Sequence, residues 1–199
     1  MSKLHMFGAP PPERADAARN RARILAAAEV LFAARGVSGV SMDELAAAAG
    51  VGKGTLYRRF GDKAGLGIAV LDARERDLQD DILRGPPPLG PGAEPVKRLH
   101  AFVDAYLDYL FRNLDLVLMS ETAAVGARYR SGVYAGWHWH LEQLLTAAER
   151  PHPNVLADYL LASLSGDLQR YLRERDTPPA AVRAALHELI GAVLGSRRR

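Results

Sequence analysis

The sequence contains no cysteine and no long apolar run. Without cysteine there can be no disulfide framework, no thiolate nucleophile and no cysteine-ligated zinc site. A transmembrane helix needs about 20 consecutive apolar residues, and no run approaches that length. Residues 1–12 also lack the basic-then-apolar order of a signal peptide. We therefore expect a soluble, cytoplasmic protein with no membrane partner.

The short motifs of several enzyme classes are also missing. There is no Gly-x-Ser-x-Gly elbow, no phosphate-binding glycine loop and no dinucleotide fingerprint. His138 and Glu142 are one helical turn apart, but the sequence lacks the two Glu-x-x-His motifs that a helical di-iron site needs. Glu149 and His152 have the Glu-x-x-His spacing of helical di-iron sites, yet Pro151 between them should break the helix. We expect no catalytic site, no metal site and no cofactor.

Charge of neither sign dominates the chain, but its distribution is uneven. The 199 residues carry 26 Lys or Arg and 23 Asp or Glu, a net charge of +3. Residues 1–63 hold ten basic and six acidic residues, a net +4, while residues 64–199 hold sixteen and seventeen, a net −1. This asymmetry is typical of a chain whose N-terminal part meets a polyanion, although arginines on a solvated helix face would give the same count.

Apolar residues recur with the helical period along the chain, and no alternating strand pattern is convincing. The fold class is therefore predicted to be all-α. Residues 84–95, with five prolines and three glycines, should form a loop. The predicted helices span residues 14–35, 42–49, 53–60, 63–83, 94–112, 115–128, 132–149, 154–174 and 179–195.

The segment from Ser41 to Phe60 has the signals of two short helices joined by a tight turn. Ser41 and Glu44 have the spacing of a capping box at the start of the first helix. Gly50 ends that helix, and a second follows from Lys53 to Phe60. Two such helices form a helix-turn-helix, whose second helix lies in the DNA major groove. The packing residues are predicted to be Ile24, Leu31, Phe32, Met42, Leu45, Ala49, Val51, Leu56 and Phe60.

The side chains left outside this packing are suited to DNA. Lys53 can donate to guanine or phosphate, and Gly54 allows close backbone approach to the groove. Thr55 can contact a base or a phosphate, whereas Tyr57 can reach a phosphate oxygen. The full set of predicted DNA-binding residues is Ser41, Lys53, Gly54, Thr55, Tyr57, Arg58, Arg59 and Lys63. The alternative is a small helical subdomain with a basic surface that never touches DNA.

The string from Ser41 to Lys63 closely resembles the DNA-binding signature of the TetR family of bacterial repressors. The shared features are Ser at the start of the second helix, Ala-Gly-Val at the turn, Gly-Thr-Leu-Tyr on the recognition helix, and Phe then Lys just beyond. The resemblance covers about residues 14–70. Arg59 and Ala64 depart from it, because many members carry His and an acidic residue there. The domains are expected to be a flexible leader (1–13), a helix-turn-helix domain (14–63), and a helical effector-binding and dimerisation domain (64–199).

The resemblance implies a homodimer formed through the last two helical segments, 154–174 and 179–195. Candidates for the apolar face of that interface are Leu156, Leu160, Leu164, Leu168, Val182, Leu186, Leu189 and Val193. The alternative is that these residues close the core of a single chain.

The resemblance also implies an effector pocket in the C-terminal domain. Ligand sites are mainly apolar with a few placed polar groups, and residues 102–140 are rich in such side chains. Aromatic residues at helical spacing are, however, more often core. The predicted ligand-binding residues are Phe102, Tyr106, Tyr109, Met119, Tyr134, Trp137 and His138.

Together these features predict a transcriptional repressor that a small-molecule effector releases from a pseudo-palindromic, double-stranded DNA operator. Two alternatives stay open. One is an activator or another DNA-bound regulator that has no small-molecule effector. The other is a helical enzyme that carries a DNA-binding module.

Overall fold

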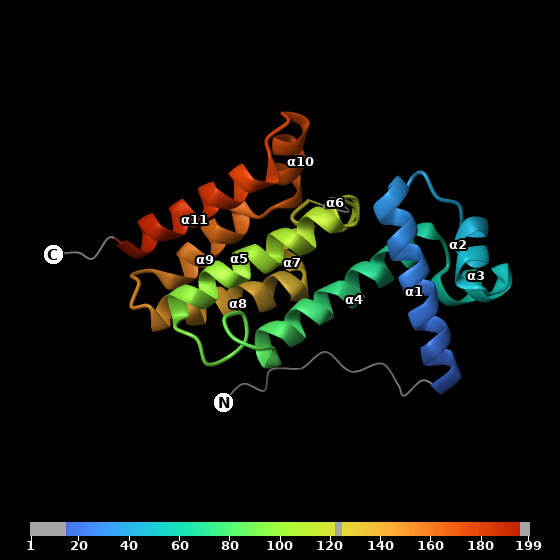
Figure 1. The fold of residues 1–199 in the computed structure, drawn as a ribbon, viewed down its shortest axis with the longest axis horizontal. Helices are drawn as coiled ribbons and strands as arrows, with labels where there is room; N and C mark the ends of the chain where they lie inside the picture. The colour runs from blue at the N-terminus through green and yellow to red at the C-terminus, as the bar shows by residue number, and fades with distance from the viewer. Residues whose placement is uncertain (1–14, 122–124, 196–199) are drawn as a thin grey trace. The chain divides into compact units, whose positions relative to one another are not determined.

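All regular structure in the described residues is helical. The computed structural model describes residues 15–121 and 125–195, and these ranges contain helices and no strands (Figure 1). The predicted all-α fold class is confirmed, while the predicted leader, residues 1–13, lies outside the described residues. None of the described helices is long and apolar enough to cross a membrane. Their bounds are α1 Ala15–Arg35, α2 Met42–Ala49, α3 Lys53–Phe60, α4 Lys63–Arg84, α5 Pro95–Arg112, α6 Leu114–Glu121, α7 Ala127–Arg130, α8 Gly132–Ala147, α9 Pro153–Ser163, α10 Gly166–Glu174 and α11 Pro179–Gly195.

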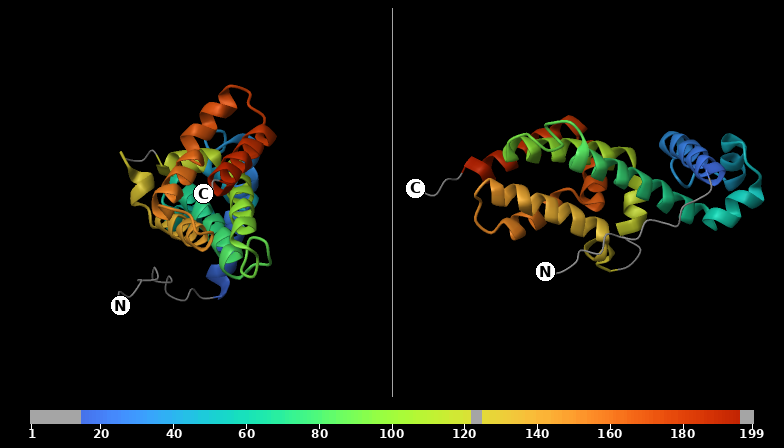
Figure 2. Two further views of the ribbon diagram at one scale, coloured as in Figure 1. Left: turned by 90° about the vertical axis from the view of Figure 1, so that its left-hand side faces the viewer. Right: turned by 90° about the horizontal axis from the view of Figure 1, so that it is seen from below.

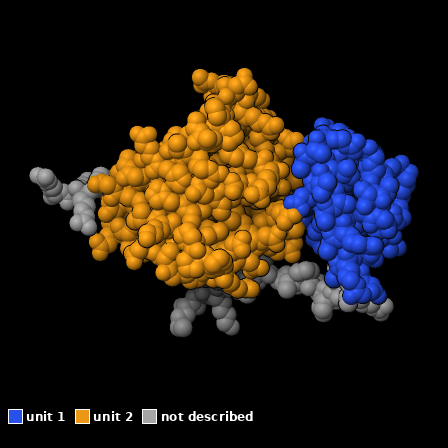
Figure 3. Space-filling view, viewed as in Figure 1, with its two compact units in different colours: residues 1–70 blue, residues 71–199 orange. Residues whose placement is uncertain are grey.

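The chain divides into two compact units, residues 1–70 and 71–199 (Figure 3). The first contains α1, α2, α3 and the start of α4, and the second contains the rest of α4 with α5 to α11. Helix α4 thus belongs to both units. The part of α4 from Leu71 to Arg84 is thus continuous in the chain with the part that belongs to the first unit.

The helices of the first unit begin and end where the local signals predict. Ser41 accepts a hydrogen bond from the Glu44 amide at 3.2 Å, and the Glu44 carboxylate accepts one from the Ser41 amide at 2.8 Å. This is the reciprocal capping box, which satisfies two amides at the start of α2. Gly50 ends α2 in the left-handed conformation, at φ 62°, which glycine adopts without steric penalty. The predicted bounds of α2 and α3 are confirmed.

The core of the first unit lies between α1, α2 and α3. Helix α1 packs on α2, and α2 packs on α3. Most of the predicted packing residues are buried, whereas Leu31, Val51 and Phe60 are half-buried. Burying one such apolar side chain contributes about 1.5–3 kcal/mol. The buried members are Ile24, Phe32, Met42, Leu45, Ala49 and Leu56.

The second unit is built around α5 and α8. Helix α5 lies beside α11 and α8, α8 packs on α9, and α6 packs on α10 (Figures 1 and 2). The apolar side chains of α5 meet helices on more than one side. Its buried residues are Leu99, Phe102, Val103, Tyr106, Leu107, Tyr109 and Leu110.

Two helices predicted to be continuous are interrupted, so those predictions are wrong. The segment predicted at 115–128 contains α6 and the separate short helix α7, with Gly126 before α7 in the left-handed conformation, at φ 70°. The segment predicted at 154–174 contains α9 and α10. Ser165 caps α10 by accepting a hydrogen bond from the Leu168 amide, while the Gly166 amide donates to Glu121 of α6 at 3.0 Å. That second contact joins distant parts of the chain, so helical periodicity could not reveal it.

A pair of histidines joins α5 to α11. The Nδ1 atoms of His100 and His187 are 2.6 Å apart, and His187 Nε2 is 2.8 Å from Asp104 Oδ1. Arg183 donates to Asp104 and to Asp108, each at 2.6 Å. Only one proton fits between the two Nδ1 atoms, so both rings cannot be fully protonated in this arrangement.

Acid is therefore expected to weaken the packing of α5 on α11. Burial, and next the charge of His187, lower the pKa of His100 below its ordinary value of 6.5. As the pH falls below about 6.5, the unfolded chain takes up a proton that the folded His100 resists, and the free energy of unfolding decreases. Urea unfolding at pH 7.5 and 5.5 should show a smaller acid-induced loss in His100→Gln than in the wild type. An equal loss in both proteins would contradict this role for His100.

Candidate DNA-binding site

Helix α3 presents a polar face to solvent. Lys53, Gly54, Tyr57 and Arg58 are exposed, whereas Leu56 is fully buried and anchors the helix from behind. The other two predicted contact residues of this helix, Thr55 and Arg59, are half-buried. An outer face of this kind, on a helix held by a buried leucine, can enter a major groove without disturbing the core.

Gly54 lies on the exposed face of α3 with open space around it. A Cβ atom built at this position would have no neighbour within 4 Å in the described part of the chain. Glycine in a helix is less stable than alanine by roughly 0.5–1 kcal/mol. The packing of this chain therefore does not explain the glycine, and its position is compatible with close approach to another molecule.

Lys53 forms an ion pair with Asp43 of α2. Both side chains are more than half exposed, so the pair contributes little to stability in water. The pair instead holds the ammonium group at the start of α3 while DNA is absent. A contact with guanine or phosphate would require Lys53 to leave Asp43 or to share its N–H groups.

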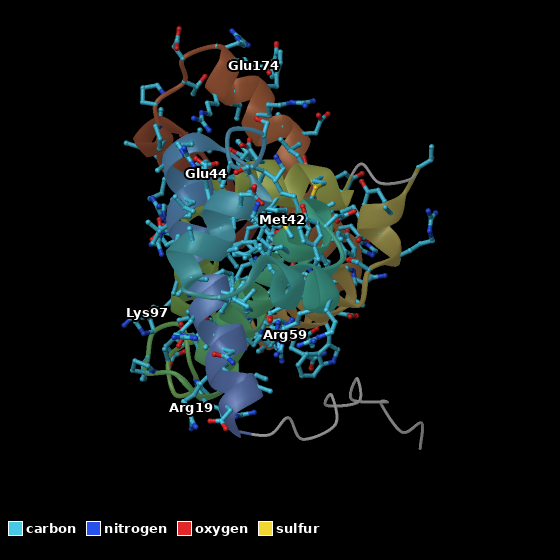
Figure 4. The ribbon with its side chains drawn as sticks, turned by 90° about the vertical axis from the view of Figure 1, so that its right-hand side faces the viewer. Arg19, Met42, Glu44, Arg59, Lys97 and Glu174 are labelled. Carbon is cyan, nitrogen blue, oxygen red and sulfur yellow. The ribbon has the colours of Figure 1, made fainter. Side chains whose placement is uncertain are left out.

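Ser41 and Glu44 are committed to the cap of α2. The Ser41 hydroxyl donates to Glu44 Oε2 at 2.7 Å, and Arg35 of α1 donates to the other carboxylate oxygen at 2.8 Å. The Arg35 guanidinium, and next the Ser41 amide, lower the pKa of Glu44 to about 2. Figure 4 shows Glu44 and Arg59 well separated on this unit. A phosphate contact by Ser41 would have to compete with Glu44 for its hydroxyl.

Lys63, in the first turn of α4, reaches back to the connection between α1 and α2. Its ammonium group donates to the carbonyl oxygens of Val40 at 2.9 Å and of Ser38 at 3.2 Å. The lysine therefore ties the start of α4 to the residues that lead into α2. An ammonium has three N–H donors, so at most one is left for a phosphate.

Replacing Lys63 by methionine is therefore expected to lower stability as well as DNA affinity. Charge-assisted hydrogen bonds contribute about 1.5–3 kcal/mol each, and the part-buried Val40 carbonyl would lose its donor. Thermal unfolding should show a clear decrease in Tm for Lys63→Met. Lys97→Met, at an exposed lysine of α5, is the matched control and should leave Tm unchanged. A wild-type Tm in Lys63→Met would contradict a stabilising role for these two hydrogen bonds.

Gly65 belongs to the junction between α3 and α4. A Cβ atom at this position would lie 2.1 Å from the Phe60 carbonyl oxygen, a distance that real structures do not tolerate. The Gly65 amide donates to the Asp62 carboxylate at 2.8 Å, which caps α4. Close approach of the backbone thus accounts for a residue that otherwise disfavours a helix.

Four of the predicted ligand-binding residues form one aromatic cluster in the second unit. The Phe102 and Tyr106 rings are 5.6 Å apart, and both lie 6.0 Å from Trp137. Tyr109 meets Tyr106 edge-on at 5.6 Å. All four side chains are at least nine-tenths buried. We call Phe102, Tyr106, Tyr109 and Trp137 the aromatic cluster.

Tyr134 and His138 form a separate group on α8. Their rings are stacked at 6.3 Å, and the Tyr134 hydroxyl donates to Asp158 of α9 at 2.8 Å. The Arg128 guanidinium lies over the Tyr134 ring, 5.5 Å from its centroid, and beside the Tyr106 hydroxyl. Met119 is half-buried on α6 and has no ring contact among the described residues. The structure therefore does not gather the predicted ligand residues into a single set.

Sequence reasoning missed Glu75. The Tyr109 hydroxyl donates to its carboxyl group at 3.0 Å, which places an acid at the edge of the aromatic cluster. A signal was present, because Leu71, Glu75, Leu78 and Ile82 follow one helical stripe whose three apolar members are buried. An acidic residue on a buried apolar stripe is a candidate functional group.

His140 also borders the aromatic cluster, 5.5 Å from Phe102. It is 7% exposed, and its Nε2 atom has no hydrogen-bond partner among the described residues. Burial, and next the charge of Arg98, lower the pKa of His140 to about 4, so the ring is neutral at pH 7. No group of three or more potential metal ligands occurs in the described parts of the chain.

The geometry of the first unit, with a capped α2, a glycine turn and an exposed basic α3, defines the chain as a protein of the helix-turn-helix DNA-binding class. Residues 24–70 match the family model of bacterial regulatory proteins of the tetR family. This match confirms the resemblance of the Ser41–Lys63 string to the DNA-binding signature of the TetR family.

Curated relatives match the N-terminal part. An HTH-type transcriptional regulator of Staphylococcus aureus is 46% identical over 69 residues, which are 35% of this chain and 36% of the relative. The chain thus matches about a third of the length of that relative.

Solved structures match over most of the chain. A TetR-family regulator from Pectobacterium atrosepticum has a TM-score of 0.65 and 25% identity, with 94% of this chain and 100% of the other covered. A transcriptional regulator from Saccharomonospora viridis, solved in complex with choline, has a TM-score of 0.70 and 21% identity over 87% of this chain and 96% of the other. These likenesses extend the shared helical fold into the second unit.

Proposed function

We propose that the protein is a homodimeric repressor that binds a pseudo-palindromic operator through α3 and leaves it when a small molecule binds the second unit. The observation that carries this proposal is the exposed face of α3. Lys53, Gly54 and Tyr57 lie on that face, on a helix locked by buried residues of α1 and α2. Two such helices in a dimer would reach successive major grooves.

Apolar side chains that remain exposed on the C-terminal helices support dimerisation. Leu160, Leu164, Val182 and Leu186 are buried within the chain itself, so they close its own core. A groove of about 560 Å³ instead lies between α9 and α11. Burial of its apolar lining and of neighbouring exposed side chains against a second copy of the chain would stabilise a dimer. The residues offered for this contact are Val155, Leu156, Tyr159, Leu189 and Val193.

The aromatic cluster supports a small-molecule effector. It combines buried rings with polar groups at its edges, as ligand sites do. The fold itself can hold a small molecule, since the Saccharomonospora viridis regulator was solved in complex with choline. An effector would release DNA only if it bound one conformation of the protein more tightly than the other. Helix α4, which belongs to both units, would carry that preference to α3.

Footprinting of the promoter region next to the gene, with a salt titration, tests the DNA-binding part of the proposal. We expect protection of a two-fold-symmetric site and affinity that falls as salt rises, because phosphate contacts release counterions. Tyr57→Phe should weaken binding by losing a phosphate contact, without a change in Tm. Only weak binding that ignores sequence would contradict the proposal, and activation of a reporter from that site would show an activator.

A further inference from the structure

A half-buried carboxyl group lies at the edge of the aromatic cluster. Glu75 lies on α4 between Leu71 and Leu78, which are both buried. Its only hydrogen-bond partner among the described residues is the Tyr109 hydroxyl, at 3.0 Å. An ionised carboxylate is disfavoured in apolar surroundings unless a cation accompanies it. Glu75 is therefore a group whose natural partner is a positive charge.

The side chains around Glu75 do not supply that charge. Asp72, one turn earlier on α4, repels a carboxylate, and Tyr109 and Tyr106 face it from α5. Arg128, beyond Tyr106, is ion-paired with Glu121, so its charge is already balanced. No basic side chain in the described residues pairs with Glu75. Burial, opposed by the Tyr109 hydrogen bond, raises the pKa of Glu75 to about 7.

The rings beside Glu75 favour the same kind of charge. Tyr109, Tyr106 and Trp137 are connected by ring contacts of 5.6 and 6.0 Å. Aromatic faces attract cations that lie within about 6 Å of the ring centre, and more strongly when water is excluded. His140, on the far side of Phe102, is neutral at pH 7 because its pKa is about 4. The cluster therefore places one carboxyl group beside aromatic rings, and both kinds of group attract a cation.

We propose that the effector is an organic cation, an ammonium group with apolar substituents, which binds with its charge at Glu75 and its apolar part against Tyr106, Tyr109 and Trp137. This inference rests on the proposed function, because it names the class of effector for the second unit. An anion would meet Glu75 and Asp72 unfavourably, and a neutral ligand would leave the carboxyl group without a counter-ion.

The position of Glu75 also connects the site to the DNA-binding unit. Glu75 is twelve residues after Lys63, the first residue of α4, on the part of the helix that belongs to the second unit. A cation that stabilises the ionised form of Glu75 acts directly on α4. The ligand would thereby favour the α4 arrangement in which this carboxylate meets its charge.

Binding of matched cationic and neutral probes to the purified full chain tests this inference by calorimetry, without DNA. The probes are benzylammonium and benzyltrimethylammonium, with benzyl alcohol as the neutral match. We expect the cations to bind more tightly than the alcohol at pH 8. Because the cation takes the ionised form of Glu75, its affinity should fall roughly tenfold between pH 8 and pH 6, for a pKa of about 7.

Two variants separate the carboxylate from general effects on folding. Glu75→Gln should weaken cation binding at least tenfold, remove its pH dependence and leave binding of the alcohol unchanged. Glu174→Gln makes the same chemical change at an exposed residue of α10 and should bind like the wild type. Equal affinity for cation and alcohol, no cation binding, or unchanged cation binding in Glu75→Gln would each overturn the inference. Footprinting without an effector still tests DNA binding, so failure here is distinguishable from failure of the proposed function.

Discussion

Replacing Glu75 by glutamine is expected to stabilise the protein at pH 8 by about 3 kcal/mol and to change its stability little near pH 4. The pKa of Glu75 is raised from 4.5 to about 7 in the folded chain. A group with a raised folded pKa contributes most to stability below pH 4.5, and that contribution is lost as the pH rises through 7. Each pKa unit corresponds to about 1.4 kcal/mol.

Glutamine keeps an oxygen that can accept the Tyr109 hydrogen bond, but it carries no charge at any pH. Urea unfolding of both proteins from pH 4 to pH 8, at one protein concentration, measures the difference directly. The other titrating groups are common to both proteins and cancel in the comparison. A variant less stable than the wild type at pH 8 would show that the carboxylate has a favourable partner in the folded chain.

Adding one methyl group at Gly54 is expected to weaken operator binding roughly ten- to a hundredfold. A Cβ atom there meets nothing in the described residues, so Gly54→Ala should fold normally. It should even be more stable by roughly 0.5–1 kcal/mol, because alanine is the better helix former. On DNA the same methyl group would hold α3 away from the base edges. An error at one base contact reduces affinity by about 1–3 kcal/mol, which corresponds to the expected loss.

Gly136 of α8 provides the matched control for this experiment. It is an exposed helical glycine, and a Cβ atom there also has open space around it. Gly136→Ala should gain similar stability and bind operator DNA as the wild type does. Wild-type operator affinity in Gly54→Ala would mean that α3 does not approach the groove closely at this residue. Titration of each protein against the footprinted site, at fixed salt, measures both outcomes.

The proposed repressor would combine these two properties in one switch. The exposed face of α3 would read the operator, while the charge state of Glu75 would respond to the ligand. The two sites have different surroundings: Gly54 is exposed on α3, whereas Glu75 is half-buried on α4. Helix α4 begins at Lys63, directly after α3 in the chain, and also carries Glu75, so the two sites are connected through one helix.

Local sequence signals were sufficient to predict the DNA-binding unit. Ser41 and Glu44 set the start of α2, Gly50 ended it, and Phe60 with Gly61 ended α3, as the structure confirms. Capping boxes and glycine turns act over three or four residues, so the sequence contains all the information they need. The same string showed the resemblance to the TetR family, which the family model matches.

The second unit depended on contacts between distant residues. At the start of α10, the Gly166 amide donates a hydrogen bond to Glu121, which is 45 positions away. The same is true of the roles of individual side chains. The helical period of the sequence does not show which side chain Glu75 contacts. In the fold, Glu75 accepts a hydrogen bond from Tyr109, which is 34 positions away. The pKa of a carboxyl group depends on the burial, the charges and the hydrogen bonds that surround it in the fold.

The sequence by itself thus determined the helical class, the resemblance to the TetR family and the bounds of α2 and α3. Short-range hydrogen bonds and the helical period decide these properties within a few residues. Only the tertiary structure decided that Lys63 donates to two backbone carbonyls. It also decided that four predicted ligand residues form the aromatic cluster, apart from Tyr134, His138 and Met119, and that Glu75 borders this cluster. Burial and charge neighbours are properties of the packed chain, because both depend on residues that only folding brings together.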